Sequence, residues 1–285
     1  MLLIPDNTTL RRFIPNTFTQ TFPDQETLYD KIQPHLTAAE LWLTETLIPH
    51  DLLHRIVEEA SNSGDPLYFV PRSIVALKAW IDAVPSLDVV VSDNGISTVE
   101  TSTLRPASKA KIDRLMDTSR EQLDQALRLL PGLLEGLSGW HHSRQSEPFR
   151  STLFHDYAVL DSLTATADNG GNIHDRFTAV LPRLKAIEDE ISRYWVSVPV
   201  MDRLRSCSRK CMSPNESRLL DLTRTAVVSI ANGTDPVHKK MLLRGLADYV
   251  ISHPEDFPEW RGTHTAALFS VRAYQNKPGS PAHWL

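Results

Sequence analysis

Apolar residues recur every three or four positions over several stretches of this chain, which is the spacing of amphipathic helices. The helices predicted from this spacing cover residues 27–48, about 52–60, about 71–83, about 109–130 and 173–195. Ser108 is a plausible N-cap for the fourth of them. The pattern therefore predicts a mainly α fold.

Prolines set the expected limits of these helices, because proline lacks an N–H and clashes with the preceding turn. Pro34 predicts a kink or a late helix start, and Pro85 predicts an end. Pro131 and Gly132 predict an interruption of the long fourth helix.

One window alternates instead with the period of a strand. Val89 and Val91 follow Leu87 at every second position, Asp93-Asn94-Gly95 comes next, and Ile96 and Val99 resume the apolar residues. Asn-Gly after a β-branched run favours a type I′ hairpin turn. We expect a small β-hairpin over about 85–104.

Both ends of the chain look like extended arms. Residues 1–26 contain three prolines and many apolar side chains, among them Phe13, Phe18 and Phe22. The tail, residues 263–285, includes Lys277-Pro278-Gly279-Ser280-Pro281 and a possible anchor, Trp284. Exposed apolar surface of this extent needs cover, either from the protein's own body or from a neighbour.

The helical pattern repeats along the chain. Residues 28–36 match 173–181 at a shift of 145, and the next two helices match at shifts of 148 and 150. This favours two related three-helix units, at 27–130 and 173–262, joined by a loop-rich crossing at 131–172. Chance similarity between amphipathic helices is the open alternative.

Composition narrows the class of protein. The 285 residues are 41% apolar and 23% charged, with a net charge of −5, which is typical of a globular chain and does not favour nucleic-acid binding by bulk charge. The two cysteines, Cys207 and Cys211, are too few for a disulfide scaffold and suggest reduced thiols. No signal peptide or membrane-spanning run is recognisable, so we expect a cytoplasmic product.

Candidate chemistry is sparse. His141, His142 and Asp156 could form a metal or general-base site, although polar loop positions beside Trp140 are the simpler interpretation. The acidic run 188–190 is expected to be a solvated helix face. Basic residues such as Arg203 and Arg205 are expected to be scattered solvated charges, and a protein partner is favoured over nucleic acid. We expect no enzyme activity, no cofactor and no metal.

Four short segments carry a resemblance: Phe69–Pro71, Ala76–Pro85, Leu87–Gly95 and Pro106–Lys109. They resemble an uncharacterised family common in prophage-like regions of gut bacteria, whose members share "IPSLDLVLT", "DNGF", "VVS" and "APAS" motifs. The resemblance covers about 27–130. The chain departs from it at Ile96, where the family has an aromatic residue, and at Arg105, where it has a small one.

The resemblance implies a phage structural protein, and the expected architecture also resembles head–tail adaptor (connector) proteins. It implies a homo-oligomeric ring that contacts the portal protein and tail or stopper proteins, with passive contact to DNA in the lumen and none to membrane. Such a protein is made in the host cytoplasm and ends in the neck of the virion. The expected partner contacts are Asp93, Asn94, Gly95, Phe13, Phe18, Phe22 and Trp284. A monomeric cytoplasmic assembly or interaction protein and a metal-dependent enzyme are the alternatives.

Overall fold

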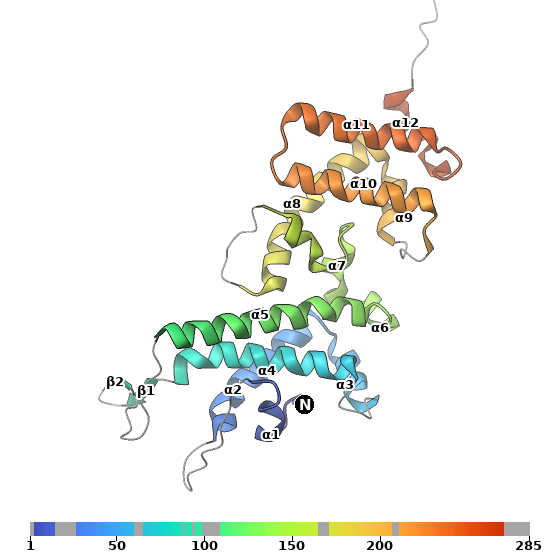
Figure 1. The fold of residues 1–285 in the computed structure, drawn as a ribbon. Helices are drawn as coiled ribbons and strands as arrows, with labels where there is room; N and C mark the ends of the chain where they lie inside the picture. The colour runs from blue at the N-terminus through green and yellow to red at the C-terminus, as the bar shows by residue number, and fades with distance from the viewer. Residues whose placement is uncertain are drawn as a thin grey trace, which may run out of the picture. The chain divides into compact units, whose positions relative to one another are not determined.

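A computed structural model of the chain describes residues 3–14, 27–59, 65–87, 89–92, 95–98, 109–164, 171–206 and 211–270. These residues are mainly α-helical, which confirms the expected class (Figure 1). The chain divides into two compact units, Met1–Leu181 (unit 1) and Pro182–Leu285 (unit 2). In the described part, no helix combines the length and the apolar character needed to cross a bilayer.

Unit 1 is built around three long helices. Its elements are α1 (Asn7–Leu10), α2 (Leu28–Thr46), α3 (His50–Glu59), α4 (Pro66–Leu87), α5 (Lys109–Leu134), α6 (Ser138–His141), η1 (Arg144–Ser146), α7 (Glu147–Arg150), η2 (Tyr157–Ser162) and the first half of α8 (Ile173–Ile191). Helix α4 packs against both α2 and α5. The predicted apolar stripes face this core, since Leu36, Ile74 and Leu127 are fully buried.

Three helices continue through prolines at which the sequence predicted kinks, ends or interruptions. Pro34 lies inside α2, Pro85 inside α4 and Pro131 inside α5. A proline inside a helix costs about 3 kcal/mol, whereas each fully buried Leu or Ile contributes about 1.5–3 kcal/mol. Burial of several such side chains on each helix outweighs the lost hydrogen bond. Pro85 lies in the last turn, where only Leu87 and Ser86 follow it.

Two four-residue strands follow α4. Strands β1 (Val89–Ser92) and β2 (Gly95–Thr98) pair antiparallel, with registers from Val89 opposite Thr98 to Ser92 opposite Gly95. In the described part of the chain they form a two-stranded sheet. The turn residues Asp93 and Asn94, and the expected N-cap Ser108, lie outside the described residues.

Residues 3–14 are not the expected extended arm, because they contain helix α1, and they pack on the protein's own body, which was one of the two expected kinds of cover. Leu3, Ile4, Leu10 and Ile14 are each at most 3% exposed. The Leu3 N–H donates to Glu40 Oε2 at 2.7 Å, and the Tyr29 hydroxyl donates to the Ile4 carbonyl at 3.0 Å. These residues therefore pack on the protein's own helix α2. The two hydrogen bonds satisfy backbone groups of Leu3 and Ile4 that burial would otherwise leave unpaired.

Unit 2 holds the rest of α8, a π-turn η3 (Ser192–Val196), α9 (Val198–Ser206), α10 (Pro214–Ala231), α11 (Pro236–Ser252), η5 (Pro258–Trp260) and α12 (His264–Phe269). Helices α10 and α11 pack together. Helix α12 corrects the expected extended tail over 264–269: the Thr263 side chain caps it by accepting from the Ala266 N–H. Residues 271–285 lie outside the described residues.

The division between the units differs from the expected one. We expected the second unit to begin at residue 173, after a loop-rich crossing at 131–172. Instead, the boundary falls within α8. Phe177 of α8 stacks on Phe149 of α7, with ring centroids 5.4 Å apart, and both are buried. The crossing and the first turns of α8 therefore complete the core of unit 1.

Candidate functional site

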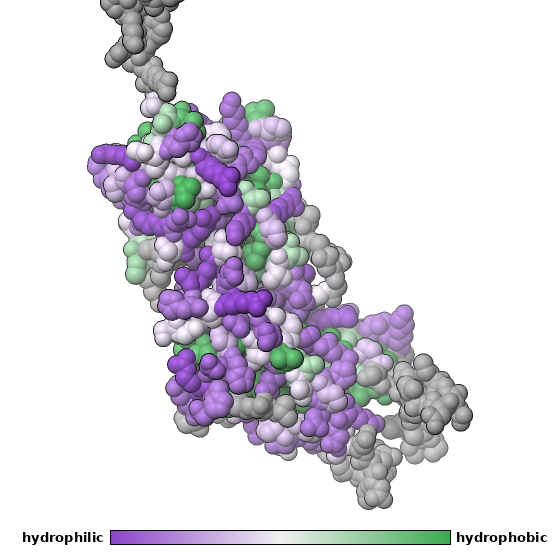
Figure 2. Space-filling view, turned by 180° about the vertical axis from the view of Figure 1, so that it is seen from behind, coloured by the Kyte–Doolittle hydropathy of each residue, from purple (hydrophilic) through white to green (hydrophobic). Residues whose placement is uncertain are grey.

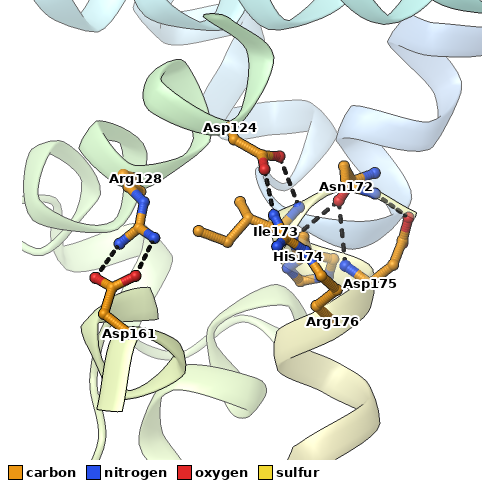
Figure 3. A network of polar contacts seen from close by, with 8 residues as sticks. All are labelled: Asp124, Arg128, Asp161, Asn172, Ile173, His174, Asp175 and Arg176. Carbon is orange, nitrogen blue, oxygen red and sulfur yellow. Dashed lines mark hydrogen bonds and ion pairs between the residues drawn. The ribbon is translucent and has the colours of Figure 1, made fainter. Parts of the chain in front are cut away.

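The N-terminus of α8 is held by a polar network (Figure 3). The Asn172 side chain accepts from the backbone N–H groups of His174 at 2.9 Å and Asp175 at 3.1 Å, as an N-cap residue does. The Asp175 carboxylate in turn accepts from the Asn172 N–H at 3.1 Å. These bonds satisfy donors that a helix leaves free at its start.

Helix α5 supplies the other half of this network. Asp124 accepts from the Ile173 N–H at 2.8 Å and pairs with Arg176. One turn further along α5, Arg128 donates to both oxygens of Asp161, at 2.9 and 2.6 Å. Figure 3 shows the two carboxylates receiving these donors. The network thus fastens α8 and η2 to α5.

Beneath this network lies a buried histidine–tyrosine pair. His174 Nδ1 and the Tyr157 hydroxyl are 3.1 Å apart, and the two residues are 5% and 1% exposed. Burial lowers the pKa of His174 to about 4, although the charge of Asp175 opposes the shift. Burial raises the pKa of Tyr157 well above its ordinary value, and the negative charges of Asp175 and Asp124 raise it further. Both side chains are therefore neutral near pH 7, and their burial favours a structural role over proton transfer to a ligand.

Of the residues considered for metal or base chemistry, His141 and His142 lie at the end of α6, whereas Asp156 lies at the start of η2. His141 Nε2 is 2.5 Å from the Glu135 carbonyl oxygen, His142 is the C-cap of α6, and Asp156 caps η2 by accepting from the Ala158 N–H at 2.9 Å. Across the described residues, no group of three or more His, Cys, Asp or Glu side chains is arranged to hold a metal ion.

The expected partner-contact residues are placed only in part. Phe13 is half-buried and its ring lies 5.1 Å from that of Phe69, which is 46% exposed. Gly95 begins β2. The remaining members lie outside the described residues: Phe18, Phe22, Asp93, Asn94 and Trp284. The structure brings Phe13 to the surface of unit 1, beside a second exposed aromatic ring.

The expectation that residues 188–190 form a solvated face is wrong for Glu188. Its side chain is fully buried and pairs with Arg205 at 3.1 Å. Arg203 is not a scattered charge either, since it pairs with Glu216 at 2.9 Å and Glu259 at 3.0 Å. Sequence spacing missed these three ion pairs, because the members of each pair come from different helices. Cys211 is an exposed free thiol, and Cys207 lies outside the described residues.

Unit 1 has a surface cleft of about 380 Å³ that the sequence did not reveal. It lies between α3, the start of α4 and the residues before α6, and its charged members are Arg55, Glu59 and Asp65. Gly139 lies so close to Arg55 that a Cβ would be 2.7 Å from the guanidinium Nη2. Glycine at this position therefore leaves room for the Arg55 side chain.

Unit 2 has a second cleft, of about 410 Å³, where α8 turns into α9. It is lined by Arg193, Tyr194, Val198, Pro199, Thr263, His264 and Thr265. The wide turn η3 changes the normal helical hydrogen bonding, and the Thr265 hydroxyl donates to the Arg193 carbonyl at 3.0 Å. That bond ties the start of α12 to the π-turn. Tyr194 and Val198 are 53% and 48% exposed.

A strained residue follows the π-turn. Ser197 has φ 83° and ψ 148°, a region that is essentially restricted to glycine. Its side chain is fully buried, and its hydroxyl has no hydrogen-bond partner among the described residues. Such strain costs about 1–3 kcal/mol and persists only where the surrounding structure holds it. The backbone conformation of Ser197 is therefore held by the residues packed around it and not by its own conformational preference.

Large apolar side chains elsewhere are dispersed over the surface. On the face seen in Figure 2, hydrophobic residues form small separate areas among hydrophilic ones. The exposed members include Leu41 in unit 1 and Met241 in unit 2, at 61% and 66%. Single exposed apolar residues are normal, so the clusters at the unit 2 cleft and at Phe13 are the informative ones.

Comparison with known proteins gives one match. A family model described as a family of unknown function (DUF6712) matches residues 18–150, a little under half of the chain. The matched range lies inside unit 1 and ends where α7 ends. No curated protein and no solved structure matches the chain.

Proposed function

We propose that this chain is a phage virion structural protein, a head–tail adaptor that forms a ring of identical copies between the portal and the tail. Its action is geometric: each copy offers surfaces to its neighbours, to the portal protein and to tail or stopper proteins. The proposal rests on the resemblance of the segments within residues 69–109, and on the mainly helical fold that such adaptors have.

The order of helices supports a finer proposal, that the chain holds two related helical units. Helices α2, α3 and α4 have 19, 10 and 22 residues, and α8, α9 and α10 have 19, 9 and 18. A proline lies inside both α2 and α8. The same long–short–long order in both places is what a duplication followed by divergence leaves behind.

The β1–β2 ladder is the observation that carries the assembly proposal. A two-stranded ladder is marginally stable by itself in water and gains stability by packing on another surface. In a ring, the neighbouring copy or the portal protein supplies that surface. Asp93, Asn94 and Gly95 then lie at a subunit contact, together with the segment that carries Phe18 and Phe22 and the tail residue Trp284. Symmetric closure of such contacts gives a ring of defined size.

The proposed position between portal and tail also implies where the protein is made and that it lies near DNA. The adaptor is made in the host cytoplasm and assembles into the neck of the virion, where DNA passes through the lumen. With a net charge of −5, the chain has no bulk attraction for DNA, so this contact is passive.

The test is the mass of the purified full-length protein, measured under native conditions alone and with a portal protein. We expect a ring of many copies. The double variant Phe18→Ser/Phe22→Ser should lower the oligomer fraction at least tenfold while the circular dichroism stays unchanged. The control is Leu41→Ser, which removes a large apolar side chain that is exposed on α2.

Deletion of residues 1–26 is a poor test, because it removes the buried Leu3, Ile4, Leu10 and Ile14 from unit 1. A protein that stays monomeric alone and with the portal protein would contradict the adaptor proposal. It would favour the monomeric assembly or interaction protein instead. If the double variant Phe18→Ser/Phe22→Ser forms oligomers as the wild type does, the N-terminal segment is not part of the subunit contact.

A further inference from the structure

The walls of the unit 2 cleft have the composition of a peptide-docking surface. Tyr194, Val198 and Pro199 provide apolar wall, and Tyr194 and Val198 leave about half of their surface exposed. Thr263 and His264, at the start of α12, also line the cleft. Grooves lined by aromatic side chains are the usual receptors of Pro-x-x-Pro segments.

The chain itself contains such a segment. Residues 277–281 read Lys-Pro-Gly-Ser-Pro, which places Pro278 and Pro281 at Pro-x-x-Pro spacing. Proline pre-sets φ, so Pro278 and Pro281 reduce the conformational entropy that the segment loses when it binds. The segment belongs to residues 271–285, which follow directly after α12, and the start of α12 lines the cleft.

The chain between the end of α12 and Pro278 is long enough to reach back to the cleft. From Ser270 back to Thr263, the distance along α12 is about 10 Å at 1.5 Å per residue. The seven residues 271–277 span up to about 25 Å when extended, so they can return Pro278 to the cleft. A short tether gives the segment an effective concentration in the millimolar range, which favours the cleft of the same chain over that of another copy.

We propose that the cleft lined by Tyr194, Val198 and Pro199 is the docking site of the Pro278–Pro281 segment of the same chain. The Thr265–Arg193 hydrogen bond ties together the two segments that line the cleft before the Pro278–Pro281 segment arrives. This docking is independent of the phage assignment, because it needs only one copy of the chain.

Disulfide trapping in the full-length protein tests the proposal. Cys207 and Cys211 are first replaced by Ser, and Ser280→Cys is then combined with His264→Cys, at an exposed position of the cleft. We expect an intramolecular disulfide to form under mild oxidation. The control combines Ser280→Cys with Met241→Cys, at an exposed position on α11 outside the cleft. Trapping should be at least tenfold faster at residue 264 than at residue 241.

A second variant separates docking from random encounter. Adding Tyr194→Ser and Val198→Ser should reduce trapping at residue 264 to the rate of the control, because both side chains are exposed and their loss leaves the core intact. Equal rates at residues 264 and 241, or trapping that Tyr194→Ser/Val198→Ser does not slow, would overturn the proposal. Disulfide-linked dimers in place of the intramolecular product would assign the segment to a second copy and would also overturn it.

Discussion

The two units place their aromatic residues differently. In unit 1, Trp140, Phe149, Tyr157 and Phe177 are each at most 3% exposed, and their ring centroids lie 5.2–5.7 Å from one another where they pair. In unit 2, Trp195, Trp260 and Phe269 are half-buried and Tyr194 is exposed. The closed cluster contributes to stability, whereas the open one leaves apolar surface for contacts.

The largest expected effect comes from opening the closed cluster. Phe149→Ala removes a ring that contacts those of Trp140, Tyr157 and Phe177. A buried Phe→Ala change costs about 3–5 kcal/mol, so the free energy of unfolding of unit 1 should fall by that amount. Urea denaturation followed by circular dichroism measures it. Phe149→Leu is the matched variant and should retain most of the stability; a loss below about 1 kcal/mol for Phe149→Ala would show that the cluster is not closed.

The next effect is a pH dependence in the same cluster. The pKa of His174 falls from 6.5 to about 4 on folding, so between these values the unfolded chain binds the proton and the folded chain does not. Stability is therefore complete above pH 6.5 and is lost as the pH falls from 6.5 towards 4. At 1.36 kcal/mol per pKa unit, the loss approaches about 3 kcal/mol.

Denaturation of the wild type and of His174→Gln over this pH range checks the prediction. The variant lacks the titrating group, so the part of the pH slope that His174 causes should vanish. Equal slopes in the two proteins would show that His174 is protonated in the folded state.

The smallest effect belongs to the open cluster. Tyr194→Ala removes a side chain that is 53% exposed, and we expect the free energy of unfolding to change by less than about 0.5 kcal/mol. Thermal denaturation of both proteins measures the difference. A loss of 2 kcal/mol or more would mean that Tyr194 belongs to the core of unit 2, and the contrast between the units would disappear.

The sequence predicted helices well where apolar spacing alone decides the outcome. The stripe Ile32, Leu36 and Leu43 is buried in α2, and α8 begins at residue 173 as expected. The predicted helix limits were wrong at Pro34 and Pro131, because the local cost of a proline is visible in the sequence while the compensating burial is not. The sequence left open whether the protein's own body or a neighbour covers the N-terminal residues, because the partner of Leu3 is Glu40, 37 residues further along the chain.

The site could be predicted less well, because its members meet only through folding. Asp124 and Arg176 are 52 residues apart, and nothing in their neighbourhoods marks them as a pair. The π-turn at Ser192–Val196 and the unusual backbone of Ser197 leave no recognisable residue signature. The Pro-x-x-Pro segment was visible as a motif, but its proposed receptor was not.

The π-turn has a consequence for how such a chain can evolve. Each residue of a helix advances the direction of its side chain by about 100°. One residue more or fewer between Ser192 and Val196 would therefore rotate the residues that follow the change, Val198 among them, relative to α8, and the hydroxyl of Thr265 would face a different carbonyl. A single insertion or deletion here would alter the recognition surface of unit 2 in one step, without any substitution in its lining.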